Sequence, residues 1–234
     1  MIVLGLDTAT PATAVALLDA SRPGEAEQRC HQPAPGERPG HSAQLLALAA
    51  ELLHGARLGF SDIDRIAVGL GPGGFTGLRI GVATARALAQ STNAELVGVS
   101  TLRALATVAE PGAPTGSGVL AVIDARRGEV FAAGWREGVP VIEQVALAPE
   151  QLAQLVSEEG GGWLAVGDGA LRFRTDLEGA GCSVPPDRSA QHGVSARAIC
   201  RIALQASQGT TRDLVVPDYL RPPDAVPARK KIDS

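Results

Sequence analysis

The stretch GLGPGGFTGLRIG, residues 69–81, contains six glycines. Because glycine has no side chain, the backbone of such a loop can lie close to a phosphate, a substrate or another protein segment. Gly69, Gly71 and Gly74 match the G-x-G-x-x-G pattern of dinucleotide sites, but the next expected strand ends without the acid that holds the ribose. Pro72 also lacks an N–H group for a pyrophosphate. A Walker A loop needs a lysine, and the chain has none before residue 230. Neither phosphate-binding motif is therefore predicted.

The turn after the first expected strand is a second candidate for phosphate chemistry. Asp7, Thr8 and Thr10 supply a carboxylate and hydroxyls, as at the phosphate turn of actin-class ATPases. Ala9 and Pro11, however, stand where glycine would let the backbone wrap a phosphate. A polar turn without nucleotide is the favoured interpretation, and an ATP site at Asp7, Thr8 and Thr10 is the alternative.

The side chains that could act as nucleophiles or metal ligands do not form a recognisable set. The three cysteines, Cys30, Cys182 and Cys200, are far apart and contain no C-x-x-C pair. No Ser/His/Asp or Cys/His motif is found, so neither catalytic residues nor a metal site are predicted. The net charge of −4 provides no positive field for nucleic acid. The start MIVLGLD lacks a signal peptide, and no apolar run is long enough for a membrane span, so we expect a cytoplasmic protein.

Hydrophobic runs and turn formers predict an α/β protein in which one order of elements occurs twice. In the first half we expect strands at 2–6, 13–18, 25–32, 65–70 and 95–99, with helices at 42–57, 76–90 and 100–109. After a linker at 111–118 we expect strands at 119–123, 130–135, 139–145, 163–166 and 182–184, with helices at 149–158, 170–177 and 195–208. This order describes two ribonuclease-H-like lobes of the actin and Hsp70 (ASKHA) class. The predicted lobes are residues 1–110 and 111–221, followed by a mobile tail at 222–234.

Three segments of the chain resemble one family closely. They are DTAT at 7–10, DIDRIAVGLGPGGFTGLRIG at 62–81 and PDYLR at 217–221, and they resemble the TsaB (YeaZ) family of the bacterial machinery that makes threonylcarbamoyladenosine in tRNA. Gly74 departs from the family, which usually has serine there. The resemblance implies a non-catalytic subunit that binds and activates TsaD, helps recruit TsaE and meets tRNA through the complex. It places ATP and metal on the partner subunits. An independent actin-class ATPase or small-molecule kinase is the alternative, and a peptidase is ranked last.

The helices at 42–57 and 76–90 are the expected docking surface, because the resemblance implies that they pair with the matching helices of TsaD. An alternative is that both helices only cover their own sheet, and periodicity alone does not say whether Ala83 or Ala85 faces outward. Without TsaD, the same surface predicts a weak homodimer. The expected interface residues are Leu45, Leu46, Ala49, Leu52, Leu53, Leu78, Arg79, Val82, Ala83, Ala85 and Arg86.

Three smaller features carry expectations of their own. TsaD carries H-x-x-x-H on its first helix, whereas the corresponding helix here begins His41-Ser-Ala-Gln-Leu45, so we expect His41 to be a solvated or capping residue. The Gly167-Asp168-Gly169 segment is expected to be a plain turn rather than a second nucleotide loop. The pair at 126–127, Arg-Arg, is expected to be solvated in a hairpin turn, with contact to TsaE or tRNA as the minor alternative.

Overall fold

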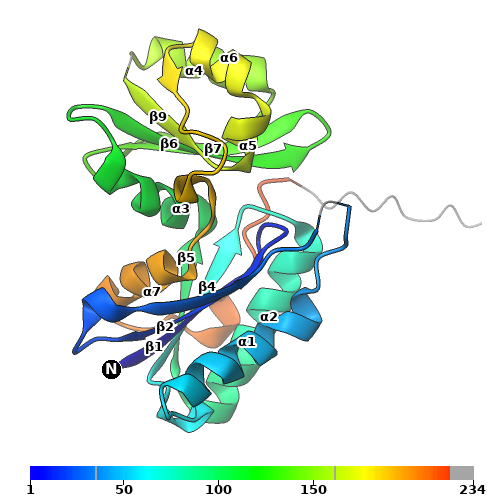
Figure 1. The fold of residues 1–234 in the computed structure, drawn as a ribbon, viewed down its shortest axis with the longest axis vertical. Helices are drawn as coiled ribbons and strands as arrows, with labels where there is room; N and C mark the ends of the chain where they lie inside the picture. The colour runs from blue at the N-terminus through cyan, green and yellow to red at the C-terminus, as the bar shows by residue number, and fades with distance from the viewer. Residues whose placement is uncertain (35, 161, 222–234) are drawn as a thin grey trace, which may run out of the picture.

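The computed structural model describes residues 1–34, 36–160 and 162–221, which form two stacked lobes, each built on a five-stranded sheet (Figure 1). The predicted mobile tail at 222–234 lies outside the described residues. No helix in the described part of the chain is long and apolar enough to cross a membrane.

The lower lobe in Figure 1 contains the first sheet, in the order β3-β2-β1-β4-β5. The three strands at one side are antiparallel, whereas β1, β4 and β5 run parallel. Short turns join the antiparallel strands, and helices provide the crossovers between the parallel ones. The strands are β1 (Ile2–Asp7), β2 (Thr13–Asp19), β3 (Glu27–His31), β4 (Arg65–Gly71) and β5 (Glu95–Ser100).

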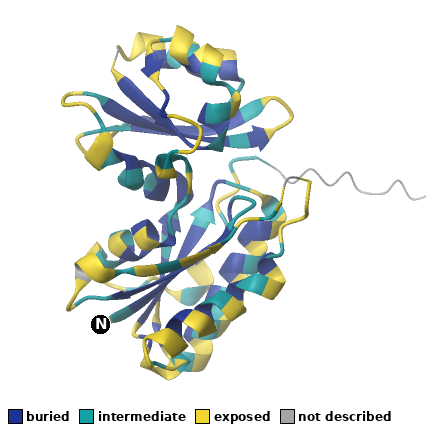
Figure 2. Cartoon of the chain, viewed as in Figure 1, coloured by how far each residue is buried: buried dark blue, intermediate teal, exposed yellow. Residues whose placement is uncertain are grey.

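Two helices cover one face of the first sheet. Helix α1 (His41–Gly55) lies over β2 and β3, and α2 (Phe75–Thr92) lies over β4 with contacts to β1 and β5. The inward sides of both helices and the strands are buried, and the outward sides of the helices are exposed (Figure 2). Helix α2 begins at Phe75, one residue before the expected start at Thr76, and Gly74 is its N-cap.

The upper lobe repeats this arrangement in its own sheet, in the order β10-β9-β6-β7-β8. Its strands are β6 (Gly118–Arg126), β7 (Glu129–Arg136), β8 (Val139–Leu147), β9 (Trp163–Val166) and β10 (Cys182–Ser183). Helix α4 (Pro149–Glu158) follows β8. The single helix expected at 170–177 is instead two short helices, α5 (Asp168–Arg172) and α6 (Arg174–Gly179), because the chain bends at Phe173.

Two helices pack against the half of the chain that lies on the other side of the predicted boundary at residue 110. Helix α3 (Thr101–Ala109) belongs to the first half of the chain, yet Leu102 and Leu105 pack in the core of the second sheet. Helix α7 (Ala196–Gln205) belongs to the second half, yet Ile199 packs against the first sheet. Figure 1 shows α3 between the lobes and α7 against the lower sheet. The boundary therefore separates the two sheets but not the two lobes, because each of these helices covers apolar surface of the other half.

After α7 the chain runs back along the exposed edge of the first sheet. Thr210 donates its N–H to the Leu96 carbonyl of β5 at 2.7 Å, and Asp218 donates its N–H to the Leu70 carbonyl of β4 at 2.8 Å. The segment therefore covers the edge strand β5, whose unpaired backbone groups would otherwise face solvent.

Candidate functional site

The glycine-rich loop packs directly on the turn after β1. Gly74 donates its N–H to the Ala9 carbonyl at 2.7 Å, and the Thr8 hydroxyl donates to the Gly77 carbonyl at 2.7 Å. A Cβ added at Gly73 or Gly77 would overlap with the backbone of this turn, and one at Gly81 would overlap with the Thr8 hydroxyl. The glycines are therefore needed for a close approach of α2 and its preceding loop to their own chain.

The same contacts occupy much of the turn that would hold a phosphate in an actin-class enzyme. Asp7 and Thr8 are each only 1% exposed, and the hydroxyl of Thr8 is already bonded to α2. The carbonyl and side chain of Ala9 lie against Gly73, where an actin-class phosphate turn would need open space. Of the three candidate nucleotide residues, Thr8 and Thr10 line a cavity, whereas Asp7 does not.

Asp7 is a buried carboxyl group with one unpaired oxygen. Its Oδ1 accepts the Ala9 N–H at 3.0 Å, whereas its Oδ2 has no hydrogen-bond partner in the structure. Loss of solvation raises the pKa of Asp7 from 3.8 to about 7, against the opposing effect of the Ala9 N–H and the nearby Thr101 hydroxyl. This carboxyl group is therefore uncharged over much of the acidic range and faces β4 rather than solvent.

His41 is buried, which corrects the expectation of a solvated or capping residue. Its Nδ1 lies 2.9 Å from the Thr13 hydroxyl, and burial lowers the pKa of the imidazole. The first turn of α1 lies on the start of β2, and Gly77 leaves room for the histidine ring. No group of three His, Cys, Asp or Glu side chains in the described ranges could hold a metal ion.

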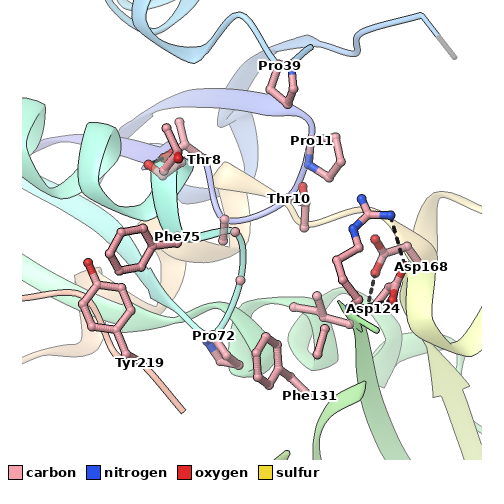
Figure 3. A pocket seen from close by; sticks show the side chains of 18 of the residues that line it. Thr8, Thr10, Pro11, Pro39, Pro72, Phe75, Asp124, Phe131, Asp168 and Tyr219 are labelled. Atoms are coloured by element: carbon pink, nitrogen blue, oxygen red, sulfur yellow. Dashed lines mark hydrogen bonds and ion pairs between the residues drawn. The ribbon is translucent and has the colours of Figure 1, made fainter. Parts of the chain in front are cut away.

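A cleft of about 550 Å³ lies between the lobes, bounded by the turn after β1, the glycine-rich loop, the β6–β7 hairpin and residues 218–221. Figure 3 shows Thr10, Phe75 and Tyr219 around it, with Asp124 and Asp168 on the side of the upper lobe. Its size lies within the range of small-molecule sites.

The two acids in this cleft already have partners. Asp124 forms ion pairs with Arg126 at 3.2 Å and Arg172 at 2.8 Å. The Asp168 carboxylate accepts the Asp124 N–H at 3.0 Å, and burial raises the pKa of Asp168. The segment expected to be a plain turn contains the start of α5, which Asp168 bonds to β6. Arg126 is exposed in the hairpin, as expected, and pairs there with Asp124. Both acids therefore form contacts within the chain.

The PDYLR segment ties the two lobes together at one side of the cleft. In addition to the bond from Asp218 to β4, Gln144 of β8 donates its side-chain N–H to the Asp218 carboxylate at 2.6 Å. Arg221 donates to the Ala125 carbonyl at 2.9 Å and to the Glu129 carboxylate at 2.5 Å. The sequence singled out this segment only by its resemblance to a family, since none of these partners is near in sequence.

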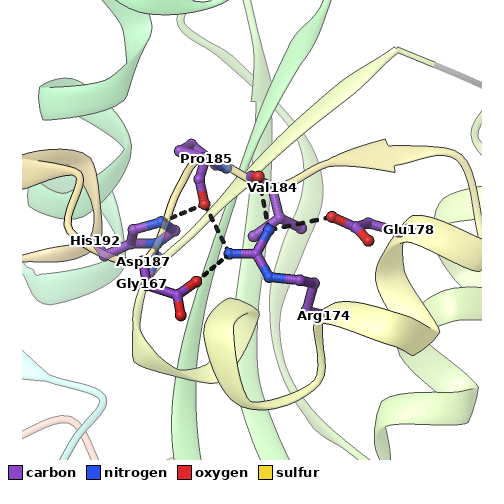
Figure 4. A network of polar contacts seen from close by, with 7 residues as sticks. All are labelled: Gly167, Arg174, Glu178, Val184, Pro185, Asp187 and His192. Atoms are coloured by element: carbon purple, nitrogen blue, oxygen red, sulfur yellow. Dashed lines mark hydrogen bonds and ion pairs between the residues drawn. The ribbon is translucent and has the colours of Figure 1, made fainter.

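A network of polar contacts in the upper lobe joins the segment after β10 to the start of α5 and to α6 (Figure 4). Arg174 donates to the carbonyls of Val184 at 2.9 Å and Pro185 at 2.8 Å. His192 accepts the Gly167 N–H at its Nδ1, so its Nε2 carries the proton and donates to the Pro185 carbonyl. These bonds hold the segment after β10 against the turn that begins α5.

The eleven predicted interface residues separate into two groups. Seven lie in the core of the lower lobe, because the aliphatic faces of both helices cover their own sheet: Leu45, Ala49, Leu52, Leu53, Leu78, Val82 and Ala85. Leu46, Arg79 and Ala83 are exposed, and Arg86 is partly exposed and forms an ion pair with Asp213 at 2.7 Å. The structure therefore answers the open question of orientation, since Ala83 faces outward and Ala85 inward.

Comparison with known proteins identifies the family. Residues 33–160 match the family model described as "TsaD: tRNA N6-adenosine threonylcarbamoyltransferase". The chain is 35% identical over 176 residues to the tRNA threonylcarbamoyladenosine biosynthesis protein TsaB of Escherichia coli, and the match covers 72% of each protein. The chain belongs to the TsaB family. The wider family that the TsaD model describes includes it as well.

Solved structures agree with this assignment. YeaZ from Pseudomonas aeruginosa superposes with a TM-score of 0.73 at 28% identity, covering 93% of this chain and 100% of that one. The ROK hexokinase from Thermus thermophilus has a TM-score of 0.51 at 14% identity, with 88% of this chain and 100% of that one covered, which shows the fold alone. The predicted two-lobed fold of the actin class is thereby confirmed, and the TsaB/YeaZ resemblance is confirmed with it.

The surface of this TsaB-family chain that remains open on α1 and α2 carries few charged side chains, which are Glu51 on α1 and Arg79 and the partly exposed Arg86 on α2. On α2 every exposed position of one stripe except Arg79 is neutral, and α1 presents small side chains around Leu46. The exposed residues of these two stripes are Thr76, Arg79, Ala83, Ala87 and Gln90 on α2 and Ala43, Leu46, Ala47 and Ala50 on α1. Surfaces depleted of charge and with small side chains allow close packing of helices.

Proposed function

We propose that this chain is a non-catalytic subunit in the biosynthesis of threonylcarbamoyladenosine in tRNA, and that it acts by binding a TsaD-type protein. One contrast supports the proposal most strongly. The turn that would hold phosphate in an actin-class enzyme is filled by Gly73 and α2, whereas the outer stripes of α1 and α2 are exposed and nearly uncharged. These features favour a protein-binding surface on α1 and α2 over a phosphate-binding catalytic site in this chain.

The family match also indicates which partner suits this surface. The matched region, residues 33–160, includes both α1 and α2, so a TsaD-type protein is expected to have a corresponding pair of helices. Two similar helix pairs can pack against each other around an approximate two-fold axis, as in isologous interfaces. The same reasoning predicts a weak homodimer when the partner is missing.

The remaining roles follow from this assignment as parts of the same proposal. The transfer reaction, with its ATP and metal, is placed on the TsaD-type partner, which this chain holds in an active state. The complex recruits TsaE and contacts tRNA, and the proposed location is the cytoplasm, where tRNA is modified. An isolated chain that modified tRNA without any partner would contradict this proposal.

The binding test uses a charge placed on the outer stripe of α2. Ala83→Glu should leave the fold intact, because the new carboxylate is solvated in the free protein, but burial in an interface without a partner costs several kcal/mol. Thr175→Glu, on an exposed position of α6 in the other lobe, is the matched control. Isothermal titration with the TsaD-type protein of the same organism should show lost binding for the first variant only. Equal affinities would place the interface elsewhere.

The alternative function is an independent ATPase or small-molecule kinase. The likeness to a hexokinase fold and the interlobe cleft are the observations in its favour. Titration of the isolated chain with Mg-ATP distinguishes it from the proposed subunit. We expect no micromolar binding, because Asp7 and Thr8 are buried. Micromolar binding that disappears in Asp7→Ala would favour the enzyme.

A further inference from the structure

The C-terminal part of the described chain carries an unusual concentration of exposed apolar side chains. Six large hydrophobic residues are exposed among the described residues, and three of them lie within residues 212–221. Leu214 is 69% exposed, Val216 50% and Tyr219 38%. Single exposed apolar residues are common on protein surfaces, but a group of them on one short segment marks an interaction surface.

This segment is anchored at several points along its length. Val215 is 1% exposed and packs in the core of the lower lobe, so its neighbours Leu214 and Val216 point outward. The Asp213 carboxylate pairs with Arg86 of α2 at 2.7 Å, and the Tyr219 hydroxyl accepts the Arg79 Nε–H at 3.1 Å. The outward side chains are therefore presented by a segment that is already tied to α2.

The segment lies beside α2, on the side away from α1. Helix α1 covers β2 and β3, α2 covers β4, and residues 210–218 bond to β5 and β4 at the opposite edge of the sheet. In Figure 1 the red end of the described chain accordingly runs on the α2 side of the lower lobe and ends between the lobes. The exposed stripe of α2 thus has α1 on one flank and the apolar segment on the other.

Covering the sheet edge does not explain the outward side chains. That cover is provided by backbone bonds from Thr210 and Asp218 and by the buried side chain of Val215. Leu214 and Val216 stay 69% and 50% exposed, so much of each side chain faces solvent rather than the sheet edge. Their exposure therefore calls for a partner that covers them.

We propose that residues 212–221 form the second half of the docking surface, so that the partner is seated on α2 between α1 and the side chains of Leu214, Val216 and Tyr219. This inference rests on the proposed function and commits to the same occupant, a TsaD-type protein. The surface is continuous with the exposed stripe of α2, and the family match shows that such a protein shares the region with this helix pair.

A cluster of aromatic rings and a guanidinium group joins the two halves of this surface. The Arg79 guanidinium carbon lies 3.9 Å from the centre of the Phe75 ring, and the rings of Phe75 and Tyr219 are 4.9 Å apart. Tyrosine and arginine are enriched at the residues that contribute most to binding. Because these side chains hold one another in place, little conformational freedom is lost when a partner covers them.

The test compares two exposed valines in different lobes. Val216→Asp should weaken the affinity for the TsaD-type protein at least about 30-fold, because the carboxylate is buried without a partner in the complex. Val139→Asp, at a residue 62% exposed on β8, should stay within about twofold of the original chain. Leu214→Asp provides a second variant if Val216→Asp unfolds, and circular dichroism with a thermal melt checks both.

The outcomes separate this inference from the proposed function. If Ala83→Glu abolishes binding while Val216→Asp and Leu214→Asp bind like the original chain, the segment is not part of the interface and the inference is overturned, although the proposed function survives. If all three variants bind normally, the interface lies elsewhere on the chain and the inference is overturned. If the original chain does not bind the TsaD-type protein at all, the proposed function itself fails. If light scattering shows that Val216→Asp abolishes only self-association, the occupant is a second copy of this chain, which also overturns the inference.

Discussion

Replacing Asp7 by asparagine changes the pH dependence of folding, because Asp7 is 1% exposed and its pKa is raised from 3.8 to about 7. At a pH below 3.8 the carboxyl group is protonated in both states and burial costs little. Between 3.8 and about 7 the folded protein keeps a proton that the unfolded chain has released. The free energy of unfolding therefore falls as the pH rises through this window.

The expected magnitude follows from the shift itself. A difference of one pKa unit corresponds to about 1.4 kcal/mol, so the rise from 3.8 to about 7 amounts to about 4 kcal/mol lost at neutral pH and above. Asparagine does not titrate, and its side-chain oxygen can still accept the Ala9 N–H. The free energy of unfolding of Asp7→Asn minus that of the original chain should therefore increase as the pH is raised from 5 to 8.

Urea unfolding at pH 5, 6, 7 and 8, followed by the fluorescence of buried Trp163, measures this difference. Asp176→Asn, at an exposed position of α6, is the control and should keep the pH dependence of the original chain. Parallel pH profiles for Asp7→Asn and the original chain would refute the reasoning. They would show that Asp7 is solvated when folded, as expected of a residue available to a ligand in the cleft.

Three further predictions concern contacts that stabilise the lower lobe or join it to the upper lobe. Gly77→Ala should lower the free energy of unfolding by about 1–3 kcal/mol in urea titrations, because the new Cβ overlaps with the Thr8 carbonyl, whereas Gly55→Ala has open space and should not. Arg65→Met should cost about 3 kcal/mol in the same assay, because the buried guanidinium group bonds the last carbonyls of α7 at 2.5 and 3.0 Å and these would be left unpaired. Arg221→Ala should increase hydrogen exchange in the β6–β7 hairpin, read by mass spectrometry, without changing exchange in α1. Unchanged exchange in the hairpin would show that Arg221 does not tie the lobes.

Local patterns were sufficient for most of the elements and for their duplicated order, although the helix expected at 170–177 is two short helices. The apolar runs that became β1, β4 and β6 are short and bounded by turn formers, and Ser100 caps α3 as predicted, accepting the Arg103 N–H at 3.4 Å. Such signals depend on neighbours within a few residues, so they can be read without knowledge of the fold. The family motifs at 62–81 and 217–221 likewise needed only the order of residues.

The sequence therefore determined the type and order of the elements and the family, whereas only the tertiary structure decided which surfaces remain open. Ala83 and Ala85 are the same residue on one helix, and their opposite exposure depends on how α2 is rotated over the sheet. The partner of the glycine-rich loop is a turn more than sixty residues away. Leu214 and Val216 were not expected in any interface, because nothing local shows that their segment returns to α2. Contacts between distant segments depend on how the whole chain packs, and the periodicity of a sequence gives no information about that packing.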